Sequence, residues 1–195
     1  VVDAVLWRNL GVPNPEQLTE LQWQSIGRPQ GIMSNMSGSS HEEDSLRVAD
    51  FFNHNTFRNM REQAPGHAVV AAHLNPSEVS AIYAGRTAVS LLRPVSGNFF
   101  PMLAVQPVQG RVIAPHDDSA SAPFVVVVSH HFWRTVLGSE PNVAGREMRI
   151  NNRLYTIAGV LPVQFTGIAT GDATDIYAPI RQSPAALEKD SWYKD

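Results

Sequence analysis

The chain has 195 residues and a formal net charge of -3; 43% of the residues are hydrophobic and 17% are charged. This composition is typical of a globular domain, and the basic residues, scattered without a run of four, give no electrostatic argument for a nucleic-acid partner. The lack of cysteine excludes thiol catalysis, cysteine-ligated zinc and disulfides, and no apolar run approaches the ~20 residues that cross a bilayer.

The chain opens with apolar residues, and a helix there should stop near Leu10 because Pro13 and Pro15 follow. Imperfect alternation of apolar and polar residues over 17–26 predicts a first strand. The Gly- and Ser-rich stretch 27–44 that follows predicts a loop.

The clearest predicted helix covers 44–66, with Asp44 or Ser45 as its cap and a Pro-Gly pair as its stop. It is expected to divide into two segments, the second capped by Asn55, because the residues in between are poor helix formers. The string HAVVAAHL at 67–74 predicts a buried strand that ends at an Asn-Pro pair. The order strand, helix, strand suggests an α/β lobe.

The second half of the chain predicts shorter elements with clear local signals. Paired strands are expected over 78–85 and 87–94, and a short helix over 96–105 with Ser96 as its N-cap. The remaining expectations are a strand and a helix over 123–138, capped by Ser129 and stopped by Gly138, a hairpin over 146–162 that turns at Asn151-Asn152, and a strand over 172–180.

His116, Asp117 and Asp118 stand in a row after a proline, which raises the question of a metal site or an acid/base site. Consecutive residues rarely converge on one ion, and a metal site normally recruits ligands from elsewhere in the fold. The pattern therefore favours a turn whose carboxylates face solvent or cap nearby amides.

Other candidate residues point the same way. His130 and His131 would project about 100° apart on a helix, and His67 and His73 lie too far apart on the predicted strand to share an ion. The acidic run 42–44 is more typical of a solvated loop or a helix start. The nucleophile-elbow, dinucleotide-binding and P-loop motifs are all missing. No catalytic, cofactor-binding or metal-binding residue is predicted, and the sequence argues against an enzyme.

A set of short strings, in this order and at these spacings, carries a resemblance to a known family. The strings are VSGNFF at 95–100, GR at 110–111, DD at 117–118, VVVVSHHFW at 125–133, PNVAGREMRINN at 141–152, YTIAGVLPVQFTG at 155–167 and DIYAPI at 175–180. The chain closely resembles the MacB-like periplasmic core domain of FtsX/MacB-type ABC-transporter permeases, in the form found in acidobacterial permeases. The resemblance covers about 1–180 and is strongest over 94–180.

The resemblance implies an α+β (mixed α/β) fold with two lobes outside the membrane. Residues 1–76 would form the first half of a porter-like βαβ lobe, just after a transmembrane helix. Residues 77–180 would form an inserted lobe with a small mixed sheet. Residues 181–195 would begin the return segment, and the remainder of the porter-like lobe would lie beyond this chain, which reads as a piece of a longer protein.

The resemblance also implies a function. The family's role is that of a non-catalytic periplasmic domain of an inner-membrane permease, coupling cytoplasmic ATP hydrolysis to substrate export or periplasmic handling, without a cofactor. The implied partners are the transmembrane helices of the same chain, an ABC ATPase subunit or domain on the cytoplasmic side, and a periplasmic adaptor or second permease copy, with no nucleic acid. Two alternatives stay open: a periplasmic ligand-binding, metal-binding or enzymatic module using His116, Asp117 and His130, and a domain that senses a ligand.

Overall fold

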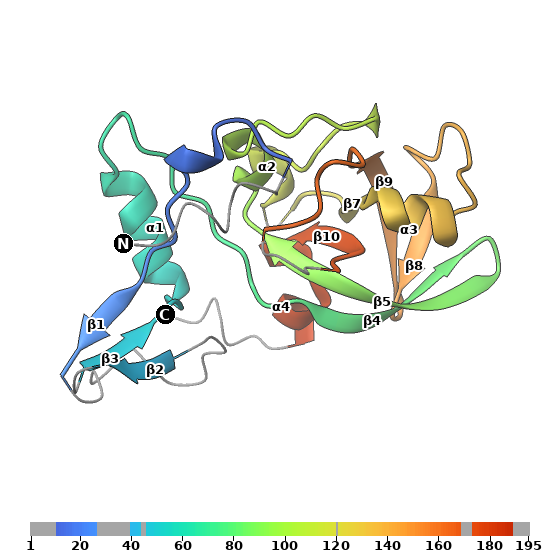
Figure 1. The fold of residues 1–195 in the computed structure, drawn as a ribbon. Coiled ribbons are helices and arrows are strands. Elements are labelled where there is room, and N and C mark those ends of the chain that lie inside the picture. Colours follow the sequence, from blue (N-terminus) through green and yellow to red (C-terminus); the bar gives the residue numbers. More distant parts are fainter. Residues whose placement is uncertain (1–10, 27–39, 44–45, 120, 169–172, 189–195) are drawn as a thin grey trace.

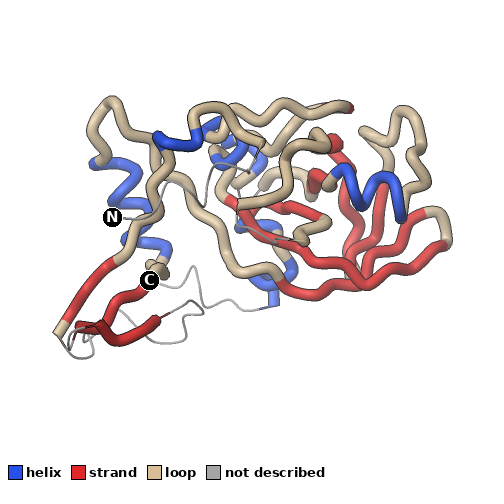
Figure 2. The backbone as a smooth tube through the Cα atoms, viewed as in Figure 1, coloured by secondary structure: helices blue, strands red, loops and turns tan. Residues whose placement is uncertain are grey.

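A computed structural model describes residues 11–26, 40–43, 46–119, 121–168 and 173–188. Within these residues the strands form two sheets, accompanied by a few short helices (Figures 1 and 2). This architecture confirms the mixed α+β class that the sequence predicts. The helix expected to stop near Leu10 lies outside the described residues.

The smaller sheet has the order β1-β3-β2 and is antiparallel throughout. Its strands are β1 (Trp23–Ser25), β2 (Ser40–Glu43) and β3 (Leu46–Ala49), and helix α1 (His54–Gln63) follows them. The indole N–H of Trp23 donates to the carbonyl of Phe51, 2.9 Å away, which ties β1 to the chain after β3. In Figure 1 this part of the molecule lies at the left.

The larger sheet takes up the rest of the chain. Its strands are β4 (Ser77–Tyr83), β5 (Arg86–Val95), β6 (Gln109–Gly110), β7 (Val125–Val128), β8 (Glu147–Ile150), β9 (Arg153–Val160) and β10 (Ile176–Pro179). The short helices between and after these strands are α2 (Phe99–Met102), α3 (His130–Thr135) and α4 (Pro184–Glu188), with 3-10 turns at Pro115–Asp117 and Ile180–Gln182.

This sheet closes on itself. Its order is β6-β9-β7-β10-β5-β4-β8, and β8 pairs with β9 as well as with β4. Among the described residues, six strands therefore form a complete ring, with β6 as a short addition along β9. We refer to this ring, Ser77 to Pro179, as the barrel. Closure leaves the six strands with neighbours on both sides and so removes free sheet edges where the pairing is complete.

Alternate residues of the strands point into the barrel, as the two-residue period of a strand requires. All six strands supply buried apolar side chains to this interior, among them Val79 and Ala81 of β4 and Met148 and Ile150 of β8. A second buried cluster joins the opposite faces of β5, β7 and β10 to Phe99 and Phe100 of α2 and its neighbours. The VVVV string thus contributes to both clusters, which explains why it is continuously apolar.

Several predictions for the first 76 residues are wrong. Residues 46–49, expected to be helical, form β3 because they pair with strands on both sides, and the helix begins only at His54. Its cap is Asn53, whose side chain accepts from the Thr56 amide at 2.7 Å, and not Asn55; the expected caps Asp44 and Ser45 lie outside the described residues. The acidic residues at 42–43, expected in a loop, belong to β2.

The strand predicted over 67–74 is also not formed. A single bridge joins His73 to Val95, and β4 starts only after Pro76, which has no amide hydrogen to donate. Val69, expected to be buried, is 64% exposed. Of the strand predicted over 17–26, only Trp23–Ser25 is extended and paired, while Pro15–Gln17 forms a 3-10 turn.

Predictions that rest on strong local signals are confirmed in the second half. Ser129 caps α3 by accepting from the Phe132 amide at 3.1 Å, and Asn151 turns the β8–β9 hairpin with a φ of 50°. The short helix over 96–105 forms at Phe99–Met102, but Ser96 does not cap it. Instead its hydroxyl accepts from the Ala72 amide at 2.9 Å and donates to the Asn98 side chain.

Two buried serines should respond to the same substitution in opposite ways. The hydroxyl of Ser90, 3% exposed, has no partner among the described residues, so Ser90→Ala should stabilise the fold by about 1 kcal/mol. Ser96→Ala should destabilise it by about 1–3 kcal/mol, since the Ala72 amide loses its acceptor. Urea unfolding of both variants checks this pair, and equal signs would contradict the assignment.

Candidate functional site

The loop that carries the His116-Asp117-Asp118 string begins at β6, which lies along the end of β9. Gly110 has a φ of 66°, and a Cβ there would stand 2.1 Å from the Ala158 carbonyl oxygen, so the strand pairing at this point needs a glycine. The Arg111 amide then donates to the same carbonyl at 2.9 Å. This anchoring fixes where the Arg111 side chain begins.

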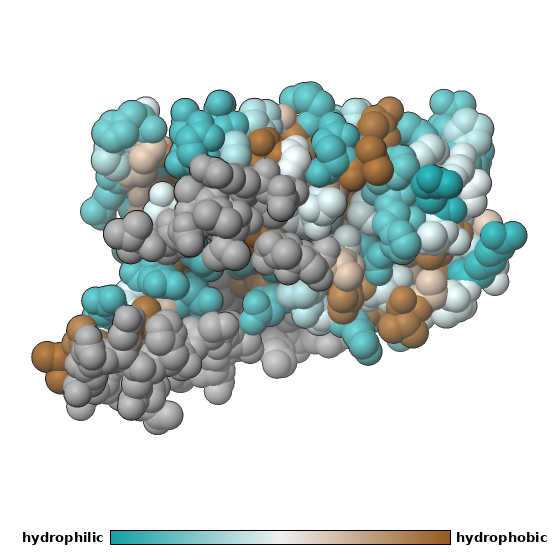
Figure 3. Space-filling model, in the orientation of Figure 1, coloured by the Kyte–Doolittle hydropathy of each residue, from teal (hydrophilic) through white to brown (hydrophobic). Residues whose placement is uncertain are grey.

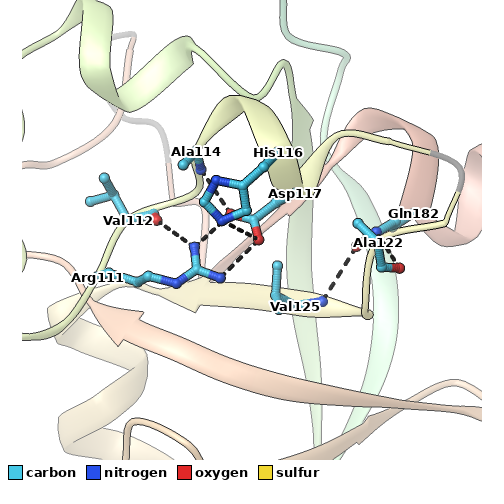
Figure 4. A network of polar contacts seen from close by, with 8 residues as sticks. All are labelled: Arg111, Val112, Ala114, His116, Asp117, Ala122, Val125 and Gln182. Carbon is cyan, nitrogen blue, oxygen red and sulfur yellow. Dashed lines mark hydrogen bonds and ion pairs between the residues drawn. The ribbon is translucent and has the colours of Figure 1, made fainter.

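Asp117 lies at the end of the 3-10 turn and is 1% exposed. Its two carboxylate oxygens accept from the Arg111 guanidinium at 2.6 and 2.8 Å, and one of them also accepts from the Ala114 amide at 2.9 Å (Figure 4). Burial acts to raise the pKa of Asp117, but the hydrogen bonds from Arg111 and Ala114 outweigh it and hold the pKa below its usual value. The carboxylate is thus charged and fully engaged within its own loop.

Asp118 points away from this ion pair and bonds to two distant parts of the chain. One oxygen accepts from the Gly97 amide at 3.2 Å and the other from the Arg181 amide at 3.1 Å. Burial raises the pKa of Asp118, and these two amide bonds offset it only in part. Gly97 must be a glycine here, because a Cβ would lie 2.7 Å from the Cα of Pro115.

Of the two histidines of the alternative metal site, His116 lies beside the Asp117 carboxylate, whereas His130 packs against an aromatic ring of its own helix. The His116 side chain is 72% exposed, and its Nε2 lies 3.5 Å from an Asp117 oxygen that Arg111 already holds. His130 starts α3 and packs its ring edge-on against Trp133 at 5.2 Å. In the part of the chain that the structure describes, no three His, Asp or Glu side chains form a group able to hold a metal ion.

Gln182 is a functional contact that sequence reasoning missed. Its side chain accepts from the Val125 amide at 3.4 Å and donates to the Ala122 carbonyl at 2.9 Å (Figure 4). The backbone carbonyl of Gln182 accepts from the Tyr155 hydroxyl at 2.6 Å. A single glutamine after a strand carries no motif, so nothing in the sequence marks it. The bonds fix the chain where it leaves the barrel.

A surface hollow of about 180 Å³ lies between the Asn151-Asn152 turn, Arg153 and α4, with Tyr155 in its lining. Burial raises the pKa of Tyr155 to about 12, and its O–H donates a hydrogen bond to the Gln182 carbonyl. It is therefore unsuited to acid/base work near neutral pH. On the face that Figure 3 displays, the described apolar residues are scattered among polar ones rather than gathered in one patch.

None of the helices in the described residues is long and apolar enough to span a membrane. Over about 70% of the chain, the fold is similar to those of two solved extracytoplasmic domains. The periplasmic region of MacB from Actinobacillus actinomycetemcomitans superposes with a TM-score of 0.56 at 18% identity, over 70% of this chain and 57% of that one. The extracellular domain of the noncanonic ABC-type transporter YknZ from Gram-positive bacteria gives a TM-score of 0.54 at 13% identity, over 71% and 67% of the two chains.

The sequence itself settles the family. The family model described as MacB-like periplasmic core domain matches residues 16–193, and the chain belongs to this family of ABC-transporter permease domains. This confirms the resemblance drawn from the motifs between 94 and 180. No curated protein matches the chain, and the chain spans little more than half of the MacB periplasmic region with which it superposes.

The ion pair in the loop predicts a pH-dependent effect of Asp117→Asn. Because the pKa of Asp117 is lowered in the fold, its stabilising contribution is present above about pH 4 and is lost as the pH falls through the folded-state value. Asp117→Asn should therefore cost about 2 kcal/mol near pH 7, a value reduced by the half-exposed arginine, and the cost should shrink toward acid pH. Thermal unfolding across pH measures this.

His116→Ala serves as the matched control for that experiment, since the neighbouring side chain is largely exposed. It should change the free energy of unfolding by no more than about 0.5 kcal/mol at any pH. A pH-independent cost of Asp117→Asn, or an equal effect of His116→Ala, would contradict the assigned role of the ion pair.

Proposed function

We propose that this chain is a non-catalytic extracytoplasmic domain of an ABC-transporter permease. In this role it couples ATP hydrolysis in the cytoplasm to substrate export or to handling of a substrate in the periplasm. The observation that carries the proposal is the family match across residues 16–193. The permease would sit in the inner membrane with this domain on the periplasmic side.

The proposed organisation follows the family pattern. Residues 1–76 form the first half of a porter-like lobe, 77–180 an inserted lobe, and 181–195 the beginning of the return segment. The closed barrel supports this division, because its strands run from Ser77 to Pro179 and so fall within the proposed inserted lobe. The proposed partners are the transmembrane helices of the same chain, an ABC ATPase, and a periplasmic adaptor or a second permease copy.

The absence of catalysis is part of the proposal and rests on how the acidic groups are used. Asp117 is engaged by a guanidinium and a backbone amide, and Asp118 by two further amides. Neither carboxylate has an unengaged oxygen facing a hollow with a histidine beside it. The alternative module built on His116, Asp117 and His130 gains no support from this geometry.

Residue 121 offers a direct test of which side of the membrane the domain occupies. Ser121 is exposed and the chain lacks cysteine, so Ser121→Cys in the complete permease introduces one accessible thiol into this domain. A membrane-impermeant maleimide added to intact spheroplasts should label it. Val128→Cys, buried in the barrel, is the matched control and should stay unlabelled. Labelling of residue 121 only after the inner membrane is broken would overturn the proposal.

Coupling to ATP hydrolysis has its own test. A fluorophore on Val89→Cys, a 75% exposed barrel position, is paired with acceptor-labelled lipids in nanodiscs that hold the permease and its ATPase. ATP should change the energy transfer, because the barrel moves relative to the bilayer. An ATPase without its P-loop lysine should abolish the change. Equal transfer with and without ATP in the intact complex would contradict the coupling.

A further inference from the structure

The chain joins the barrel through two short stretches, and each is fastened by its own hydrogen bonds. The incoming segment, residues 70–74, precedes β4, and the outgoing segment, residues 180–183, follows β10. Any force that reaches the barrel along the backbone must pass through one of them. How these two segments are held relative to each other therefore decides how the barrel responds.

The incoming segment is hydrogen-bonded to the end of β5 and to the turn after it. The Leu74 amide donates to the Pro94 carbonyl at 2.9 Å, and Ser96 and Ala72 exchange bonds through the Ser96 amide and hydroxyl. The Asn98 side chain donates to the Val70 carbonyl at 2.9 Å. These contacts all end at residues 94–98, so this turn carries the incoming segment.

The outgoing segment is held by a different set of contacts. Gln182 bonds to Ala122, Val125 and Tyr155, which belong to the β7 and β9 side of the barrel. Ser183 and Ile180 are buried, and the Ser183 hydroxyl donates to the Ile180 carbonyl at 2.9 Å. None of these side-chain bonds reaches residues 94–98, although the parallel pairing of β10 with β5 brings Pro179, just before the outgoing segment, opposite Val95.

Asp118 bonds to both sets. Its carboxylate joins the Gly97 amide, within the turn that carries the incoming segment, to the Arg181 amide of the outgoing segment. The backbone of Asp118 is held in place, because Asp118 directly follows the residue that Arg111 binds. A short, half-buried side chain with a hydrogen bond to each carboxylate oxygen is a stiff link, since it has few rotamers to explore.

We propose that Asp118 is a positioning residue that ties the incoming and outgoing segments together, so that both connections and the barrel move as one rigid unit. This rests on the proposed function, in which movement arrives along those connections. Asp117 and Asp118 thus have different roles. Asp117 stabilises the loop through its ion pair, and Asp118, held by that loop, bonds to two distant segments.

The test measures the separation of the two segments in the complete permease. Spin labels are placed at Val69→Cys, 64% exposed beside the incoming segment, and Leu187→Cys, 41% exposed in α4 after the outgoing one, with any cysteines elsewhere in the permease removed. The parent protein should give one narrow distance distribution, unchanged by ATP. Asp118→Ala should broaden this distance distribution, whereas Asp117→Asn should leave the mean distance between the labels unchanged. A distribution as narrow in Asp118→Ala as in the parent would overturn the proposal.

A second variant keeps the test decisive if Asp118→Ala fails to fold. Asp118→Asn has the same size, but its side-chain NH2 takes the place of one carboxylate oxygen and cannot accept a hydrogen bond. The backbone amide at that position therefore loses its bond. Hydrogen exchange at Gly97 or Arg181 should then speed up by ~10-fold, with other amides of the barrel unaffected. Unchanged exchange at both positions would also overturn the proposal.

The two proposals fail in different ways. The width of the distance distribution is measured without nucleotide, so it reports on Asp118 even if the permease never couples to ATP. Conversely, ATP could move the barrel relative to the lipid while Asp118→Ala leaves the distance between the spin labels unchanged. That result would support the proposed function and contradict the proposed role of Asp118.

Discussion

The pairing of β8 on both of its sides is the constraint on which the rest of the structure depends. β8 meets β4 at two residue pairs and β9 at four, and this double pairing turns an open sheet into the barrel. Met148 and Ile150 of β8 point inward and are almost fully buried, so the strand that closes the barrel also contributes to its core. The turn at Asn151 sets the register of β8, and the Asn151 side chain also accepts from the Ser80 amide of β4.

Closure has a consequence for the groups that could do chemistry. The six strands of the barrel fill its interior with buried apolar side chains. Polar residues are displaced to the loops at its rim, where Arg111, Asp117, Asp118 and Gln182 lie. There they are used to join segments.

The sequence predicts the elements that short-range physics determines and fails where distant pairing decides. The capping bond of Ser129 and the positive φ of Asn151 are local features, so these two roles can be read directly from the sequence. Residues 46–49 have helix-compatible neighbours, yet pairing with β1 and β2 makes them a strand. Ser96 looks like a cap, but its hydroxyl bonds to Ala72, 24 residues earlier. Hydrogen bonds between residues so far apart in the sequence leave no local pattern, and for the same reason the sequence does not predict the contacts of Gln182.

The acidic pair illustrates the same limit in electrostatic terms. Asp117 and Asp118 are identical and adjacent, yet the pKa of the first is lowered and that of the second raised. Both are desolvated, so burial alone does not separate them; the difference lies in the partner, a bidentate guanidinium for one and two neutral amides for the other. Positive charge from Arg61 and Arg181 acts on Asp118 only at longer range and leaves the penalty of burial dominant. Burial is unfavourable for the Asp118 carboxylate, yet each of its oxygens accepts from a backbone amide of a different part of the chain. The bonds that join these two segments are therefore the physical reason for a carboxylate at this position.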